Sequence, residues 1–102
     1  MIINILLSIF LTFQPANSVS FTLRNATLSS IPLEIPGVMN PNLSPMSNSG
    51  VTLEVGQKVY YFPSGQKAKG KRALLLIADE SLEGKTLIVN ELIKELEKKA
   101  QD

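Results

Sequence analysis

The chain has 102 residues, which suits one domain and is too short for two. Its formal net charge at neutral pH is only +1, so no global field attracts nucleic acid or an anionic membrane. Histidine and cysteine are both absent, which excludes disulfides, thiolate nucleophiles and imidazole bases. The same absence removes the usual ligands of zinc, haem and copper.

The N-terminal segment has the pattern of a secretory signal peptide. Residues 2–13 are mostly apolar, but this run is too short to cross a bilayer, which takes ~20 apolar residues. Ala16 and Ser18 place small side chains at the two positions that signal peptidase reads. We therefore predict a signal peptide over residues 1–18, cleaved before Val19, and no transmembrane span after cleavage.

The signal peptide predicts an exported protein, located in the periplasm, on the outer surface or in the medium. The first charged residue of the chain is Arg24, so the segment lacks the basic residues that usually orient a signal peptide. The alternative is that residues 2–13 form a buried strand or core helix of a cytoplasmic protein.

The next two segments alternate between apolar and polar residues, which is typical of strands with one face exposed to solvent. They are residues 19–24 and residues 31–35. In the second, Pro32 cannot donate to a ladder, which places this strand at a sheet edge or places the proline at the strand's start. The side chains predicted to point inward are Val19, Phe21, Leu23, Ile31, Leu33 and Ile35.

Residues 36–50 predict a long loop. The segment is rich in proline, asparagine and serine, and we expect neither a helix nor a central strand in it. Four apolar residues within it predict that the loop packs onto the body of the domain. They are Val38, Met39, Leu43 and Met46.

The next segments predict a hairpin, a basic loop and a buried strand. Residues 51–55 alternate with Val51, Leu53 and Val55 inward, and Gly56-Gln57 predicts a tight turn that joins them to a strand over residues 58–62 as a hairpin. A polar loop over residues 63–72 follows. Residues 73–78 are a continuous apolar run, which predicts a strand buried on both faces.

The C-terminal segment predicts an amphipathic helix over residues 90–101. Asn90 is a favourable N-cap, and the apolar stripe at helical spacing consists of Leu92, Ile93, Leu96 and Ala100. Residues 85–89 fit either a short strand or an extra helical turn. The whole pattern predicts a mainly β fold for residues 19–102: a small β-sandwich or open barrel of five or six short strands with one C-terminal amphipathic helix.

A basic cluster is the first candidate site. Lys67, Lys69, Lys71 and Arg72 fit a solvated hairpin tip, and they also fit a patch that binds an anion such as an anionic glycan. Three neighbouring aromatic residues could stack on a ligand, although aromatic residues in strands more often pack in the core. They are Tyr60, Tyr61 and Phe62.

A carboxylate cluster is the second candidate. Asp79, Glu80 and Glu83 lie close together in sequence but lack the spacing of a calcium loop. With no histidine or cysteine to act as a base or ligand, we predict no catalytic residue, no cofactor and no metal. The alternative is a small metal-binding protein or enzyme that uses these three carboxylates.

The sequence of residues 30–62, SIPLEIPGVMNPNLSPMSNSGVTLEVGQKVYYF, resembles segments of small exported bacterial proteins of uncharacterised function. The resemblance implies periplasmic or outer-surface residence and no activity. We therefore expect a non-enzymatic binding or accessory module. The candidate partners are an envelope protein or an anionic glycan, and the near-neutral charge argues against nucleic acid.

Overall fold

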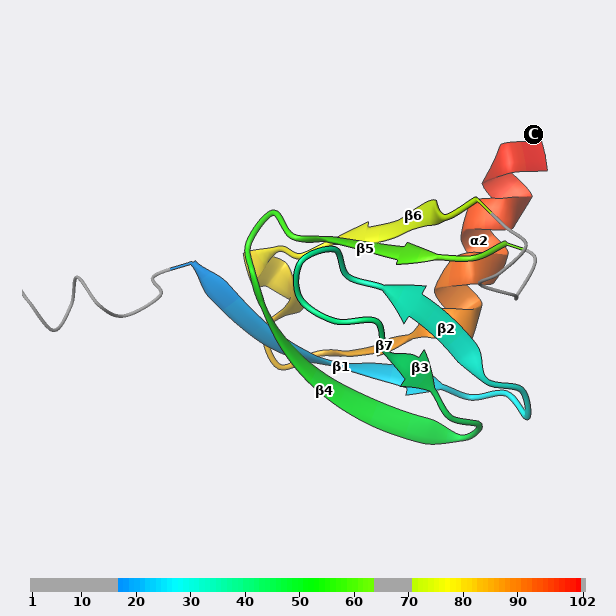
Figure 1. The fold of residues 1–102 in the computed structure, drawn as a ribbon, viewed down its shortest axis with the longest axis horizontal. Helices are drawn as coiled ribbons and strands as arrows, with labels where there is room; N and C mark the ends of the chain where they lie inside the picture. The colour runs from blue at the N-terminus through cyan, green and yellow to red at the C-terminus, as the bar shows by residue number, and fades with distance from the viewer. Residues whose placement is uncertain (1–16, 64–70, 102) are drawn as a thin grey trace, which may run out of the picture.

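The computed structural model describes residues 17–63 and 71–101 and consists mainly of β-strands, with one helix at its C-terminal end (Figure 1). The mainly β prediction is confirmed, with seven strands in these two ranges in place of five or six. The extra strand is residues 42–43, within the predicted loop, and residues 86–88 form the strand that the sequence left undecided. In chain order the elements are β1 (Ser18–Asn25), β2 (Ile31–Glu34), β3 (Asn42–Leu43), β4 (Ser47–Glu54), β5 (Lys58–Tyr61), β6 (Ala73–Ile77), the 3-10 helix η1 (Glu80–Leu82), β7 (Thr86–Ile88) and α2 (Val89–Gln101).

The first sheet has three strands in the order β4-β1-β7. β1 lies in the centre, antiparallel to β4 along its whole length and parallel to β7 over three residues. Hydrogen bonds from the segment before β7 continue the contact, with the Gly84 N–H donating to the Ser20 carbonyl at 2.8 Å. The undecided residues 85–89 therefore contain a strand, because β1 offers them an edge to pair with.

The second sheet has four strands in the order β3-β2-β5-β6, and all its pairs are antiparallel. β2 is an interior strand, with β3 on one side and β5 on the other. Pro32 is tolerated because it lies near the start of the strand. The Leu33 N–H donates to the Pro41 carbonyl, on the β3 side. Because successive residues alternate, the nitrogen of Pro32 faces β5. It needs no partner there, since β2 pairs with β5 only from Leu33 onward.

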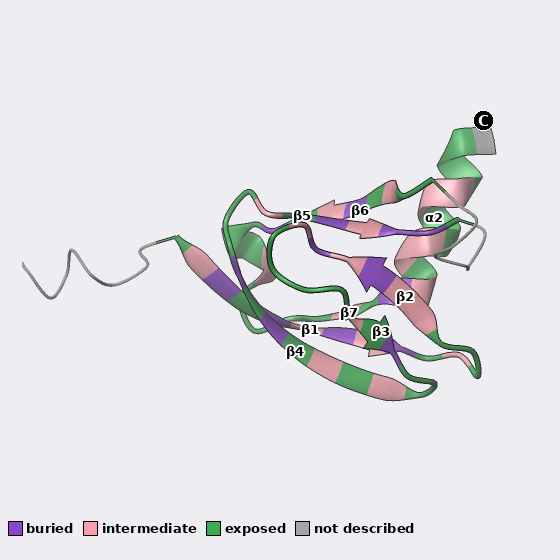
Figure 2. Ribbon diagram, in the orientation of Figure 1, coloured by how far each residue is buried: buried purple, intermediate pink, exposed green. Residues whose placement is uncertain are grey.

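One core lies between the two sheets, and the alternation predicted for β1 is confirmed (Figure 2). The buried apolar side chains of β1, β2 and β5 come from alternate positions, as expected when one face of each strand is covered. Helix α2 contacts β1, β6 and β7 and packs three partly buried residues against this core. These residues are Leu92, Ile93 and Leu96.

The predicted hairpin at Gly56-Gln57 is wrong. β4 and β5 belong to different sheets, so the turn between them is a corner that carries the chain from one sheet to the other. Gly56 adopts a φ of 98°, which favours glycine, and its N–H donates to the Ala78 carbonyl at 2.9 Å. Beyond β4 the alternation also fails, because Val55 lies on this exposed corner.

The predicted loop over residues 36–50 is wrong in part. It contains β3, which pairs with β2, and the first four residues of β4, which pair with β1. β4 is an edge strand, so the expectation that no central strand forms here holds. Of the four apolar residues expected to pack on the body, only Leu43 is buried. The other three, Val38, Met39 and Met46, are exposed because they lie in turns between strands.

The prediction that residues 73–78 are buried on both faces is also wrong. β6 is the outer strand of its sheet, and its register pairs Leu74 with Tyr60 and Ile77 with Lys58 on the face away from the core. Leu74 is 42% exposed and Ile77 is 47% exposed. A continuous apolar run therefore does not by itself distinguish a central strand from an edge strand.

The C-terminal helix is confirmed, with small changes at its start. α2 begins at Val89, directly after β7, so Asn90 lies inside the helix and is not its N-cap. The Asn90 side chain instead accepts a hydrogen bond from the Ala26 N–H at 2.9 Å. Ala100, the last residue of the predicted stripe, is exposed.

Candidate functional site

The basic cluster is only partly within the described residues. Lys67 and Lys69 lie outside them, and Lys71 is exposed. The Arg72 guanidinium forms an ion pair with Glu34, and it lies 4.1 Å from the centre of the Tyr60 ring. Arg72 therefore already has an acidic partner and an aromatic partner, both of which it would have to leave or share to bind an anion.

The aromatic residues next to this cluster do not form a stacking platform. Tyr61 and Phe62 are buried, and Tyr60 lies beneath Arg72. Their burial agrees with packing as the commoner role of aromatic residues in strands.

The three carboxylates of the second candidate do not converge. Asp79 accepts a hydrogen bond from the Ser81 hydroxyl at 2.8 Å, and Glu83 accepts one from the Ser20 N–H at 3.0 Å. Within residues 17–63 and 71–101 no three acidic side chains are placed to hold a metal ion together. The Glu83 carboxylate instead extends the contact between β1 and the segment that precedes β7.

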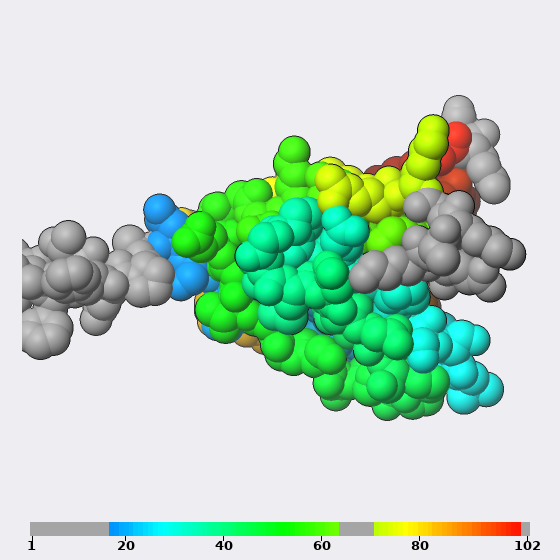
Figure 3. All heavy atoms as spheres, viewed as in Figure 1, coloured from blue at the N-terminus to red at the C-terminus, as the bar shows by residue number. Residues whose placement is uncertain are grey.

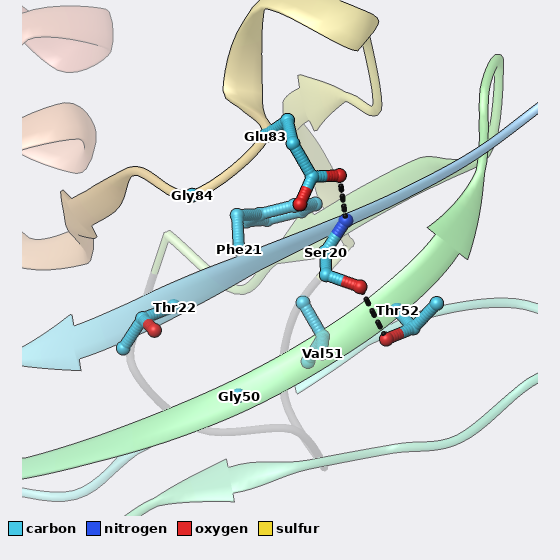
Figure 4. Close-up of a pocket in the computed structure, with 8 residues that line it drawn as sticks. All are labelled: Ser20, Phe21, Thr22, Gly50, Val51, Thr52, Glu83 and Gly84. Carbon is cyan, nitrogen blue, oxygen red and sulfur yellow. Dashed lines mark hydrogen bonds between the residues drawn. The ribbon is translucent and has the colours of Figure 1, made fainter.

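A shallow groove on the outer face of the first sheet contains this carboxylate (Figure 4). Its volume is about 300 Å³. The hydroxyls of Ser20 and Thr52 lie 2.8 Å apart and bond to each other, and Glu83 bonds to the backbone of β1. Because these polar groups already satisfy one another, the groove joins neighbouring strands and exposes little unpaired chemistry to a ligand.

A second hollow, with a volume of about 440 Å³, lies between the β5–β6 pair and α2. Tyr61 and Ala73 line it from the sheet, and Glu97 and Ala100 line it from the helix. Burial raises the pKa of the Tyr61 phenol, and the negative charge of Glu97 raises this pKa further. The hollow is mainly apolar in lining and contains one carboxylate.

A network of polar side chains lies at one end of the sandwich, where two turns meet. We define the two-turn tip as residues 26–30, which join β1 to β2, and residues 44–46, which join β3 to β4. Fully buried Asn25 holds these turns together. Its amide donates to the carbonyls of Ser29, Leu43 and Ser44 at 2.7, 3.1 and 3.1 Å.

The oxygen of the Asn25 side-chain amide is hydrogen-bonded as well. Its oxygen accepts hydrogen bonds from the Thr27 N–H at 2.9 Å and from the Thr27 hydroxyl at 2.7 Å. The Met46 N–H donates directly across the gap between the turns, to the Thr27 carbonyl at 3.0 Å. Because a buried amide must find partners for both its ends, this network fixes the relative position of the two turns.

The two-turn tip presents apolar side chains to solvent. Leu28 is 86% exposed and Met46 is 54% exposed. Met46 also adopts a φ of 52°, a left-handed conformation that costs a residue with a side chain ~1–2 kcal/mol. The turn is therefore held in a strained shape that keeps a large apolar side chain outside the core. In Figure 1 the two turns lie side by side at the lower right.

No pattern in the sequence points to this site. Asn25-Ala26-Thr27 matches a glycosylation acceptor pattern, but the Asn25 amide is buried and fully bonded, so it is not accessible. Leu28 and Met46 sit in turns that look unremarkable in sequence, and only the pairing of β1 with β4 brings the turns together.

Comparison with known proteins adds no further assignment. No family model, curated protein or solved structure matches the chain. Among the helices of the described ranges, none has the length and apolar character needed to cross a membrane.

Proposed function

We propose that this protein is a small exported, non-enzymatic binding module that engages a protein partner through the two-turn tip. Export is supported by the signal-like pattern of residues 1–18, and a non-enzymatic role by the lack of histidine and cysteine. The proposed location is the periplasm, the outer surface or the medium.

The observation that carries this proposal is the exposure of Leu28 and Met46 on turns that Asn25 holds rigidly. Ordering a flexible loop on binding costs free energy, and a loop that is already fixed avoids that cost. Loops at the end of a rigid β-sandwich are a common location of recognition surfaces. Backbone strain that persists at such a position is itself a reason to look for function there.

The chemistry of the two-turn tip favours an apolar pocket on a protein over an anionic glycan. No charged residue occurs in residues 25–30 or 41–50. A glycan that carries negative charge would gain no ion pair here, whereas Leu28 and Met46 offer apolar surface whose burial contributes ~25 cal/mol per Å². A partner from the cell envelope fits the proposed location.

A photo-crosslinking amino acid placed in the chain tests the proposal. We expect position 28 and position 46 each to give one discrete adduct with the same protein in native cells, because both face the partner. Position 94 on the exposed face of α2 is the matched control and should give none. Adducts at all three positions, or at none, would contradict a partner at the two-turn tip. Lipid adducts without a protein adduct would identify a membrane surface instead.

Met46→Gly separates binding from folding. Glycine adopts a positive φ without strain, so we expect the free energy of unfolding to stay equal or rise by up to ~1 kcal/mol while the adduct at position 28 is lost. An adduct that persists at wild-type yield would show that the Met46 side chain is not part of the surface.

Intact-mass measurement of the exported product tests export and signal cleavage separately. We expect the mature chain to begin at Val19 or within a residue or two of it. In the structure the Asn17 carbonyl accepts a hydrogen bond from the Val55 N–H and Ser18 pairs with Glu54, so cleavage before Val19 removes the first residue of β1 together with these contacts. Full-length protein recovered only from the cytoplasm would contradict the export proposal and leave the two-turn tip to be tested on its own.

A further inference from the structure

The two sheets have four outer strands, and three of them carry features that discourage pairing with another chain. β3 has only two residues, and β7 has three and continues directly into α2. β4 is longer, but the residues on its outer face are polar or small. These residues are Asn48, Gly50, Thr52 and Glu54. Short edges and polar edges are common ways in which proteins avoid edge-to-edge association.

The outer edge of β6 is neither short nor polar, and its one irregularity is a β-bulge at Leu75. Its sequence, ALLLI, contains no charged residue and no proline. Leu74 and Ile77 are exposed on the face away from the core. In Figure 3 the yellow atoms of β6 lie along the upper rim of the molecule.

The backbone of β6 also presents unpaired groups at this edge. The Ala78 N–H and carbonyl both bond toward β5, to Gln57 and Gly56. Because successive residues of a strand direct these groups to opposite sides, the Ile77 N–H and carbonyl point away from β5. Within the described part of the chain no strand lies on that side.

The two ends of β6 carry opposite charges. Lys71 and Arg72 precede the strand, and Asp79 and Glu80 follow it, and all four residues are exposed. A second copy of β6 placed antiparallel along this edge would bring the basic end of each strand to the acidic end of the other. A parallel copy would place like charges together, which is unfavourable.

We propose that β6 is a dimerisation edge, at which two copies of this chain pair antiparallel about a twofold axis between Leu75 and Leu76. This register places Ile77 of one copy opposite Leu74 of the other, the two residues that point away from β5 on either side of the bulge. In this register Lys71 of one copy lies opposite Glu80 of the other, and the contact is the same on both copies, as a twofold interface requires. The second sheet then continues across the dimer. This inference depends neither on export nor on the two-turn tip.

Sedimentation analysis over a range of protein concentrations tests the proposal. We expect the wild-type protein to form a reversible dimer, and Ile77→Lys to weaken dimerisation by at least ~tenfold because it places a charge on the pairing edge. Leu28→Lys is the matched control, since it adds the same charge at an exposed apolar position far along the chain from β6, and it should leave dimerisation unchanged.

A charge exchange tests the orientation of the two strands. Lys71→Glu alone should weaken the dimer, because the new carboxylate would face Glu80 of the second copy, and adding Glu80→Lys should restore it. Circular dichroism of each variant establishes that it is folded. Failure of the double variant to recover would contradict the antiparallel register.

Amide exchange gives a readout that needs no substitution. The outward amide of Ile77 should become protected as the concentration rises through the dimerisation range, while amides of the polar β4 edge should not. A protein that stays monomeric at all accessible concentrations would overturn the proposal. So would a dimer that survives Ile77→Lys, or one that leaves the Ile77 amide unprotected.

Discussion

β1 and β6 are both apolar strands, yet the structure uses them differently. β1 is the central strand of its sheet, and every second residue from Val19 to Asn25 is buried. β6 is more continuously apolar in sequence but forms an edge, with Leu74 and Ile77 exposed. Alternation therefore identified which face of β1 is buried, whereas apolar content alone did not identify the buried residues of β6. The difference matters because a buried face contributes to stability and an exposed apolar face is available for association.

The largest expected effect tests this difference directly. Leu23 in β1 is 0% exposed, so Leu23→Ala should lower the free energy of unfolding by about 2–5 kcal/mol. Leu74→Ala in β6 deletes the same atoms and should cost about 0.5 kcal/mol or less in the monomer. Urea denaturation at low protein concentration measures both. Equal losses would show that β6 is covered in solution as fully as β1.

The polar residues at the ends of the two strands extend the comparison. Asn25→Ala at the end of β1 leaves the carbonyl of buried Leu43 and the partly buried carbonyls of Ser29 and Ser44 without this donor, and we expect the free energy of unfolding to fall by about 2–3 kcal/mol. Arg72→Ala before β6 removes an exposed ion pair and a ring contact and should cost at most ~1 kcal/mol. The same denaturation experiment compares them. A larger loss at Arg72 would mean that its pair with Glu34 is structurally essential.

Helix α2 runs from the β1 side of the molecule toward the β6 side. Leu92 lies near its start, which follows β7, whereas Glu97 and Ala100 face Tyr61 and Ala73. Both leucines of the stripe, Leu92 and Leu96, are partly buried. Each Leu→Ala change should therefore lower the free energy of unfolding by about 1–2 kcal/mol, which is less than for a fully buried leucine. We expect the larger loss of stability for Leu92→Ala, because Leu92 is closer to the β1 side.

Thermal denaturation of the two variants measures this order. Lys94→Ala, on the exposed face of the same helix, is the control and should change stability by less than about 0.5 kcal/mol. If neither leucine variant is destabilised, α2 does not contribute to the core in solution.

The sequence predicted the parts of the fold in which local pattern and tertiary environment agree. β1, the inward residues Leu33 and Ile35, and the apolar stripe of α2 are examples, because alternation or helical spacing records which face is covered. The first half of β4 was missed. Its residues, Ser47 to Gly50, have low strand propensity, and they form a strand only because β1 supplies a partner for their backbone.

Other features depend on contacts that are distant in sequence. Gly56-Gln57 fits a hairpin or a corner equally well as a local turn, and only the sheet order distinguishes them. The two-turn tip could not be predicted, because Asn25 bonds to carbonyls as far away as Ser44. Asp79 and Glu83 are close in sequence, yet Asp79 bonds to the Ser81 hydroxyl and Glu83 to the Ser20 N–H. Proximity in sequence was therefore a poor guide to a shared site.

The smallest expected effect concerns Tyr61, which pairs with Ala73 at the start of β6. Burial, and then the charge of Glu97, raises the pKa of this phenol above its ordinary value near 10. The folded state therefore holds the phenolic proton more tightly than the unfolded state does. This contribution to stability is fully present below about pH 10 and is lost as the pH rises through the folded-state pKa.

Denaturation at a series of alkaline pH values, compared between variants, isolates this contribution. Relative to wild type, Tyr61→Phe should remove the part of the stability loss above about pH 10 that comes from this phenol. Glu97→Gln should make that part smaller, because it removes one of the two causes of the raised pKa. Tyr60→Phe leaves Tyr61 as the one tyrosine, so the ultraviolet absorbance of tyrosinate then reports its titration directly. An ordinary pKa in that variant would show that water reaches Tyr61 through the hollow beside α2, and that the β6 side of the core is more open than the β1 side even at its buried positions.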